Sequence, residues 1–236
     1  MDLAPGERAA ARRAAVQQSL SVALATGLYA VSFGALSVAA GLDLPQTMAL
    51  SLLMFSGGSQ FAFIGVIGAG GTAAAAVAAA SLLGARNGLY GPLVAPFTGA
   101  RGWRRALAAQ VTIDESTAVS TAQPTPEAAR AAFWWTGVGI FVLWNVFTLA
   151  GALLGDALGD PRRYGLDAAA AAAFLALLWP RLASRPARLV AALGMGVALV
   201  LPPLVPSGLP VLAAAPLAIV IRRRRGPQQP DAQEAA

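Results

Sequence analysis

The sequence predicts an all-α integral membrane protein with about six to seven hydrophobic segments, including broken or re-entrant half-helices in the first half of the chain. Of its 236 residues, 57% are hydrophobic and 12% are charged. That charged fraction is about half the average for soluble domains. The mean hydropathy is +0.62. These values indicate that lipid, and not water, is the main solvent of the folded chain.

Apolar stretches follow one another along most of the chain. They cover roughly 19–41, 45–68, 72–97, 132–154, 166–182, 189–201 and 209–221. The first ends without an Ala-x-Ala cleavage pattern, so we interpret it as a retained helix. The last two are short, and they need flanking residues or thinned lipid to span the bilayer. In the fourth, Gly151-Ala-Leu-Leu-Gly155 matches the small-xxx-small pattern of helix contact.

Arginine clusters set the predicted topology and the domain boundaries. They lie at 8–13, 101–105, 181–188 and 222–225. Such clusters bracket hydrophobic spans, and the positive-inside rule places them all in the cytoplasm, so they do not indicate nucleic-acid binding. We predict a basic cytoplasmic segment at 1–18, a transmembrane transporter domain at 19–221, and a basic, then disordered, tail at 222–236.

This topology requires a re-entrant element before the second arginine cluster. If the first helix leaves the cytoplasm near Asp43, the stretch 45–97 must cross an odd number of times to return Arg101 inside. One of its two segments is then a broken or re-entrant pair of half-helices, with Gly57-Gly58 and the run 84–88 as break points. The segment 106–122 begins and ends inside, and we predict that it is re-entrant or lines a cavity.

Gly57, Gly58, Ser59 and Gln60 form a polar island in the second apolar stretch. Adjacent glycines weaken a helix, and a helix that restarts near Ser59 would turn free N–H groups toward a substrate carboxylate. The alternative is that the glycines only let a neighbouring helix pack closely.

Arg86 lies near the middle of the third apolar stretch, followed by Asn87. An arginine there costs at least about 2.5 kcal/mol unless it is paired or hydrated. Its partner is predicted to be a ligand acid, Asp114 or Glu115, since a guanidinium can hold a carboxylate through two hydrogen bonds. A purely structural ion pair is the alternative interpretation.

Asp114 and Glu115 are adjacent acids in an otherwise apolar region. Helical spacing directs them to different faces, so one could carry protons while the other pairs with an arginine. The alternative is a hydrated loop in which both acids balance the nearby arginines.

The composition excludes several classes of chemistry. The chain has no Cys and no His, and all its basic residues are arginine. Disulfides, zinc sites, imidazole bases and Schiff bases are therefore excluded. No Walker loop or dinucleotide motif is present, so we expect no cofactor, no metal and no enzymatic activity.

The polar islands, in this order, resemble those of the AzlC family, the large subunit of branched-chain amino acid exporters. The matching motifs are Ser32-Phe-Gly-Ala35, Phe55-Ser-Gly-Gly-Ser-Gln-Phe61, Ala85-Arg-Asn-Gly-Leu-Tyr-Gly91 and Thr112-Ile-Asp-Glu115. The resemblance implies proton-driven export of leucine, isoleucine, valine and often methionine with a small hydrophobic AzlD-type subunit. The family often has histidine where this chain has Asn87, which assigns the proton role to Asp114 and Glu115.

We therefore expect a multi-pass transporter of the inner (plasma) membrane that exports apolar amino acids. Gly57, Gly58, Ser59, Gln60, Arg86 and Asn87 are the predicted substrate-binding residues. Asp114 and Glu115 are predicted to couple protons or to form the ion pair. The competing hypothesis is a non-transporting scaffold or assembly subunit whose polar islands bind a partner.

Overall fold

The computed structural model describes residues 4–158, 175, 179–201 and 204–205. The chain divides into two compact units, residues 1–174 and 175–236. Every regular element of the described residues is helical, which confirms the predicted all-α class. The predicted apolar stretch 209–221, most of the stretch 166–182 and the tail 222–236 lie outside the described residues.

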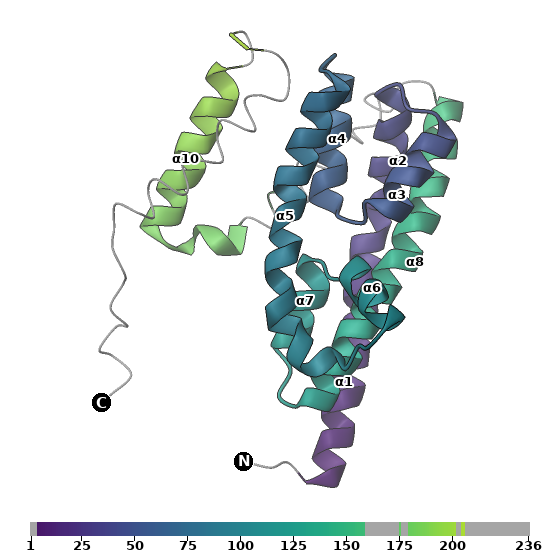
Figure 1. The fold of residues 1–236 in the computed structure, drawn as a ribbon, viewed down its shortest axis with the longest axis vertical. Coiled ribbons are helices and arrows are strands. Elements are labelled where there is room, and N and C mark those ends of the chain that lie inside the picture. Colours follow the sequence, from purple (N-terminus) through teal and green to yellow (C-terminus); the bar gives the residue numbers. More distant parts are fainter. Residues whose placement is uncertain (1–3, 159–174, 176–178, 202–203, 206–236) are drawn as a thin grey trace. The chain divides into compact units, whose positions relative to one another are not determined.

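Unit 1 consists of long helices that run its length and two hairpins of short helices (Figure 1). The elements are α1 (Pro5–Leu28), α2 (Ala30–Ala39), α3 (Leu44–Leu53), α4 (Gly57–Gly68), α5 (Ala73–Thr98), α6 (Trp103–Gln110), α7 (Asp114–Thr121) and α8 (Pro126–Leu158). The first apolar stretch is one predicted helix, but the structure interrupts it at Tyr29 between α1 and α2.

Helices α2 and α8 pack backbone to backbone through glycines. A Cβ atom added at Gly151 would lie 2.0 Å from the carbonyl oxygen of Val31, and one added at Gly34 would lie 2.1 Å from that of Thr148. No side chain fits at either position. The small-xxx-small pattern in this part of α8 thus marks a real helix contact, as such patterns do where backbones approach closely.

The second apolar stretch folds into the hairpin α3–α4. Asp43 caps α3, since its carboxylate accepts the N–H of Gln46 at 2.7 Å while the Gln46 side chain accepts the N–H of Asp43. The helix ends at Leu53, and α4 begins at Gly57. The predicted half-helix pair is therefore present, but its break lies at residues 54–56 and not at the glycines themselves.

The segment 106–122 forms the second hairpin, α6–α7, whose tip is residues 111–113. Ser116 fastens this tip: its hydroxyl accepts the N–H of Ile113 and donates to the carbonyl oxygen of Val111 at 2.7 Å. Figure 1 shows α6–α7 at the end of unit 1 where the chain starts, and α3–α4 at the other end. The Gln110 side chain donates to the Leu52 carbonyl oxygen at 2.8 Å, so the two hairpins meet near their tips.

Helix α5 is a single helix, so the predicted break at 84–88 is wrong. Alanines fill its first turns, and alanine has the highest helix propensity. Thr72 caps its start by accepting the N–H of Ala75 at 3.2 Å, and Gly99 ends it with a φ of +64°. A glycine in this left-handed conformation is a common helix terminator. The 26 residues of α5 extend over about 39 Å.

Away from its arginine-rich end, unit 1 exposes many apolar side chains, and its interior holds small polar ones. Leu20, Leu24 and Leu28 point outward at helical spacing and are 47%, 51% and 51% exposed. Inside, the buried Ser51 hydroxyl donates to Thr148 at 3.3 Å. Hydrogen-bonded small residues between helices are typical of membrane bundles. Two helical segments, Pro5–Ala39 and Pro126–Gly155, are long and apolar enough to cross a bilayer.

In unit 2 the described residues form a short 3-10 helix, η2 (Trp179–Ala183), and α10 (Arg185–Val200). The Ser184 hydroxyl caps α10 by accepting the N–H of Ala187 at 3.3 Å. Helix α10 covers residues 189–200 of the predicted stretch 189–201 and begins four residues before it.

Candidate functional site

Arg86, the arginine of α5, has a carboxylate partner from the second hairpin. Nη2 of Arg86 lies 2.6 Å from Oδ2 of Asp114, and their side chains are 36% and 17% exposed. Asp114 is the first residue of α7, directly after the hairpin tip. Of the predicted partners within the chain, the structure selects Asp114 over Glu115. The pair brings together residues that are 28 positions apart in sequence.

Tyr90 completes the environment of this carboxylate. Its hydroxyl donates to Oδ1 of Asp114, so the two carboxylate oxygens have different partners, Tyr90 and Arg86. Sequence reasoning did not identify Tyr90. The signal was its position one helical turn after Arg86, because residues four apart share a helix face.

The start of α4 lies against the same arginine. A Cβ atom added at Gly58 would be 3.1 Å from Nη2 of Arg86, and one added at Gly84 would be 3.1 Å from the Ser59 hydroxyl. The two glycines therefore let α4 and α5 approach closely. The N–H groups of Gly57, Gly58 and Ser59 are the first of α4 and have no carbonyl partner within the helix.

The helix restarts at Gly57 and not near Ser59 as predicted, so the N–H of Gln60 is not free for a ligand. Because α4 begins at Gly57, the N–H of Gln60 already bonds to the Ser56 carbonyl oxygen at 3.0 Å. The fully buried Gln60 side chain donates to the Leu50 carbonyl oxygen at 3.0 Å, which ties α4 to α3. Gln60 thus holds the hairpin together, and its Oε1 has no partner within the described residues.

Two adjacent residues of α5 have polar side-chain atoms without hydrogen-bond partners among the described residues. Nε of Arg86 and Oδ1 of Asn87 are buried and unbonded in the described part of the chain. Buried polar atoms usually have partners, so the unpaired Nε of Arg86 indicates room for a polar ligand or water beside the ion pair.

Glu115 is the second residue of α7, directly after Asp114. It forms no ion pair among the described residues, whereas its charge, with those of Asp114 and Arg86, acts on the Tyr29 hydroxyl. Tyr29 and Trp144 form an edge-to-face ring pair with centroids 5.0 Å apart. A Cβ atom added at Gly57 would be 3.0 Å from the Trp144 ring and 3.3 Å from the Tyr29 hydroxyl. Tyr29 and Trp144, here called the aromatic wall, therefore lie beside the start of α4.

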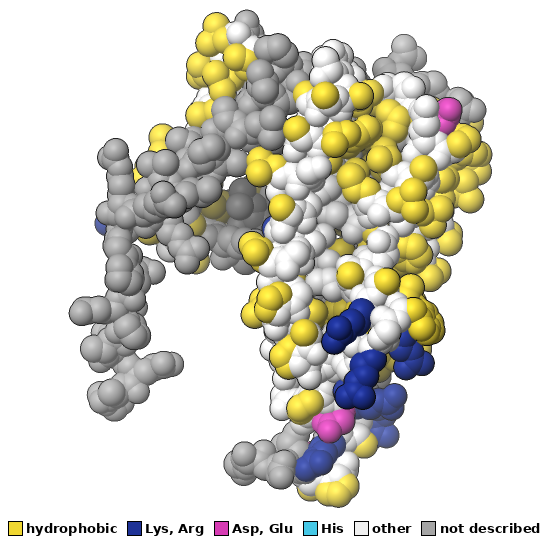
Figure 2. Space-filling view, viewed as in Figure 1, with side chains coloured by type: hydrophobic (Ala, Val, Ile, Leu, Met, Phe, Trp, Pro, Cys, Tyr) yellow, Lys and Arg dark blue, Asp and Glu magenta, His cyan; other side chains and the backbone are white. Residues whose placement is uncertain are grey.

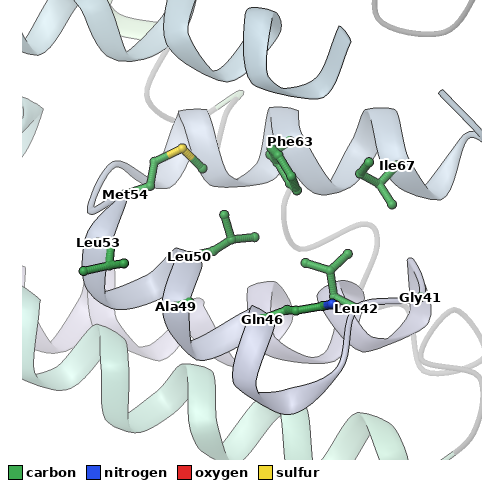
Figure 3. A pocket seen from close by; sticks show the side chains of 9 residues that line it. All are labelled: Gly41, Leu42, Gln46, Ala49, Leu50, Leu53, Met54, Phe63 and Ile67. Carbon is green, nitrogen blue, oxygen red and sulfur yellow. The ribbon is translucent and has the colours of Figure 1, made fainter. Parts of the chain in front are cut away.

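An open apolar groove of about 500 Å³ runs between the arms of the first hairpin (Figure 3). Leu50 and Phe63 extend into it from α3 and α4, and Leu42 and Met54 lie toward its two ends. Neither Arg86 nor Asp114 lines it. The groove is thus separate from the charged cluster.

Replacing Tyr90 by phenylalanine is expected to weaken the site without unfolding the protein. The change removes the hydroxyl that donates to Asp114, and a hydrogen bond to a charged group contributes about 1.5–3 kcal/mol. The apparent melting temperature of the detergent-purified protein should fall. Tyr29→Phe is the matched control, since the Tyr29 hydroxyl does not bond to Asp114, and an equal loss in both variants would contradict this role.

Within the described residues no group of acidic side chains is arranged to hold a metal ion. The arrangement is a paired arginine and aspartate, a second acid, free helix N–H groups and an aromatic wall. Among known proteins, the family model described as AzlC protein matches residues 21–158, more than half of the chain. The match covers every residue of this site. No curated protein and no solved structure matches.

Proposed function

The chain belongs to the AzlC family of transport-associated membrane proteins, and from this premise we propose that it is a secondary transporter that exports branched-chain or similar apolar amino acids. Leucine, isoleucine, valine and methionine are the proposed substrates. The observation that carries the proposal is the Arg86–Asp114 pair at the point where the two hairpins meet.

The ion pair suits a zwitterionic ligand. Without substrate, Arg86 and Asp114 neutralise each other at 2.6 Å. An amino acid carries one charge of each sign, so its carboxylate can bind Arg86 while its ammonium group binds Asp114. Substrate then replaces the internal pair without leaving an unpaired charge, which is costly in a poorly solvated site.

The first turn of α4 supports the same orientation of the substrate. The N–H groups of Gly57, Gly58 and Ser59 carry partial positive charge next to Arg86, and helix starts favour carboxylates. Glu115, which has no ion-pair partner among the described residues, is the second acceptor for the ammonium group and the proposed carrier of a coupled proton.

The aromatic wall accounts for apolar side chains. Tyr29 and Trp144 lie beside Gly57, and Trp144 is 2% exposed. An aliphatic side chain placed there would bury its surface with a gain of about 0.8 kcal/mol for each CH₂ group.

We further propose that the protein is a multi-pass plasma-membrane protein that works with a small hydrophobic AzlD-type subunit. The arginines at the starts of α1 and α6 gather at one end of unit 1 (Figure 2), which supports placing that end in the cytoplasm. The lack of any nucleotide-binding motif in the sequence favours an ion gradient as the energy source.

Efflux from cells loaded with dipeptide tests the proposal. Cells that hydrolyse a leucine-containing or methionine-containing dipeptide accumulate the free amino acid, and expression of the protein with its small subunit should increase the efflux rate several-fold. Loading with an alanine-containing dipeptide controls for leakage. Equal efflux with and without the protein would refute the substrate assignment.

The same cells separate transport from a scaffold role. If the protein only assembles a complex, Asp114→Ala will disrupt recovery of the small subunit in co-purification. If it transports, Asp114→Ala will stop efflux while the small subunit still co-purifies. The second result is expected.

A further inference from the structure

We propose that a pocket between the end of α5, the start of α6 and the start of α8 binds the phosphate of an anionic phospholipid headgroup. The pocket has a volume of about 340 Å³. Its lining residues come from all three helices and the loop between the first two: Thr98, Gly99, Ala100, Trp103, Arg104, Leu107, Arg130 and Trp134. None of them belongs to the proposed substrate site, and the inference does not depend on transport.

The charge of the pocket favours an anion. Arg104 and Arg130 contribute two positive charges, and no lining residue is acidic. Within the described part of the chain neither arginine forms an ion pair. Guanidinium groups recognise phosphate oxygens through paired hydrogen bonds. A phosphate in this pocket would neutralise two charges that have no acidic partner among the described residues.

Contacts with the end of α5 fix the position of the Arg130 side chain. Its Nε donates to the carbonyl oxygen of Phe97 at 2.8 Å, and its guanidinium lies over Gly99, where an added Cβ atom would be 2.8 Å from Nη2. Trp134 donates from its ring N–H to the Thr98 carbonyl oxygen at 3.4 Å. These bonds fix one wall of the pocket, so binding does not have to order it.

The apolar rim indicates a lipid as the source of the phosphate. Trp103 is 71% exposed and Leu107 is 47% exposed, which gives an acyl chain a surface to lie on. The guanidinium carbon of Arg104 is 6.0 Å from the centre of the Trp103 ring. Exposed tryptophan next to arginine is typical of the headgroup level of a bilayer.

The position of the pocket agrees with this ligand. It lies at the end of unit 1 where the arginines gather (Figure 2), which the positive-inside rule assigns to the cytoplasm. Basic pockets between helices on that side suit anionic headgroups.

Native mass spectrometry of the full-length protein in neutral detergent tests the inference with phosphatidylglycerol and phosphatidylcholine as probes. The protein should retain phosphatidylglycerol in preference, and Arg104→Gln should lower its affinity about fivefold. Trp103→Ala should also lower the affinity for phosphatidylglycerol, since it removes apolar surface that the acyl chain would contact. Arg104 is chosen for substitution because Arg130 also donates a hydrogen bond to the end of α5, so its loss could affect the fold.

Arg12→Gln is the matched control, because it removes the same charge from the same end of unit 1 outside the pocket. It should leave lipid retention unchanged. Equal loss in Arg12→Gln and Arg104→Gln would show general charge attraction and overturn the site. Displacement of the lipid by millimolar inorganic phosphate would show a free-anion site and overturn the assignment to lipid.

Discussion

Replacing Arg86 by alanine is expected to abolish export while the protein still inserts into the membrane. The change removes the group proposed to bind the substrate carboxylate, and it leaves Asp114 without its partner at 2.6 Å. Breaking a buried pair costs about 3–5 kcal/mol. Here the cost is lower because the two side chains are 36% and 17% exposed. Efflux should fall to the level of cells without the protein, and membrane fractionation should show normal insertion.

Two further variants separate binding from folding. Arg86→Lys keeps the charge but loses the planar fork, so efflux should be strongly reduced and not abolished. The double variant Arg86→Gln with Asp114→Asn removes both charges and should recover the apparent melting temperature without recovering efflux. Export by the double variant at the rate of the unmodified protein would show that the pair is only structural.

Replacing Gly151 by alanine is expected to be the most damaging single change for stability. The new Cβ atom would lie 2.0 Å from the Val31 carbonyl oxygen and 2.7 Å from its carbonyl carbon. These are backbone atoms that no rotamer change can move, so α2 and α8 must separate. Overpacking costs about 1–3 kcal/mol where side chains can adjust, and more is expected where backbone must shift. The apparent melting temperature and the yield after detergent extraction should both drop.

Gly65→Ala is the matched control in the same unit. Gly65 is also helical, and an added Cβ atom there would meet nothing within 4 Å. Alanine should therefore be neutral or stabilise α4, because glycine costs a helix interior about 1 kcal/mol. If both variants lose stability equally, the close contact between α2 and α8 is not the cause.

The broken helix was predictable from the sequence, but its position was not. Polar and small residues at 55–60 indicate a break. The structure places the glycines inside the first turn of α4, where Gly57 admits Trp144 and Gly58 admits Arg86. The two interpretations of the glycines were a helix break with free N–H groups and close packing of a neighbouring helix, and the structure contains elements of both. Whether a given glycine starts a helix or makes room for a neighbour depends on residues that are distant in sequence.

At residues 84–88 the sequence predicted a helix break that the structure does not have. The two glycines of this run suggest a break, yet α5 continues through them. Gly84 instead makes room for the Ser59 hydroxyl. A glycine lowers helix propensity by only about 1 kcal/mol, and tertiary packing overrides that amount. The sequence alone cannot distinguish a glycine that ends a helix from one that admits a neighbour.

The sequence offered three possible partners for Arg86: the acid of a bound ligand, Asp114 or Glu115. Helical spacing predicts different faces for Asp114 and Glu115. The choice between them depends on how the second hairpin is placed against α5, which is a matter of tertiary contacts. Tyr90 was within reach of the same reasoning, because it shares the helix face of Arg86.

The two hairpins meet near their tips, residues 54–56 and 111–113, and Asp114 at the second tip pairs with Arg86. Under the proposed transport function, a solute bound at Arg86 would be covered by α3–α4 from one end of unit 1 and by α6–α7 from the other. Movement of one hairpin would then open the site to one side of the membrane while the other hairpin still closes it. Helices α2 and α8, whose backbones touch through Gly34 and Gly151, would be the part that stays still.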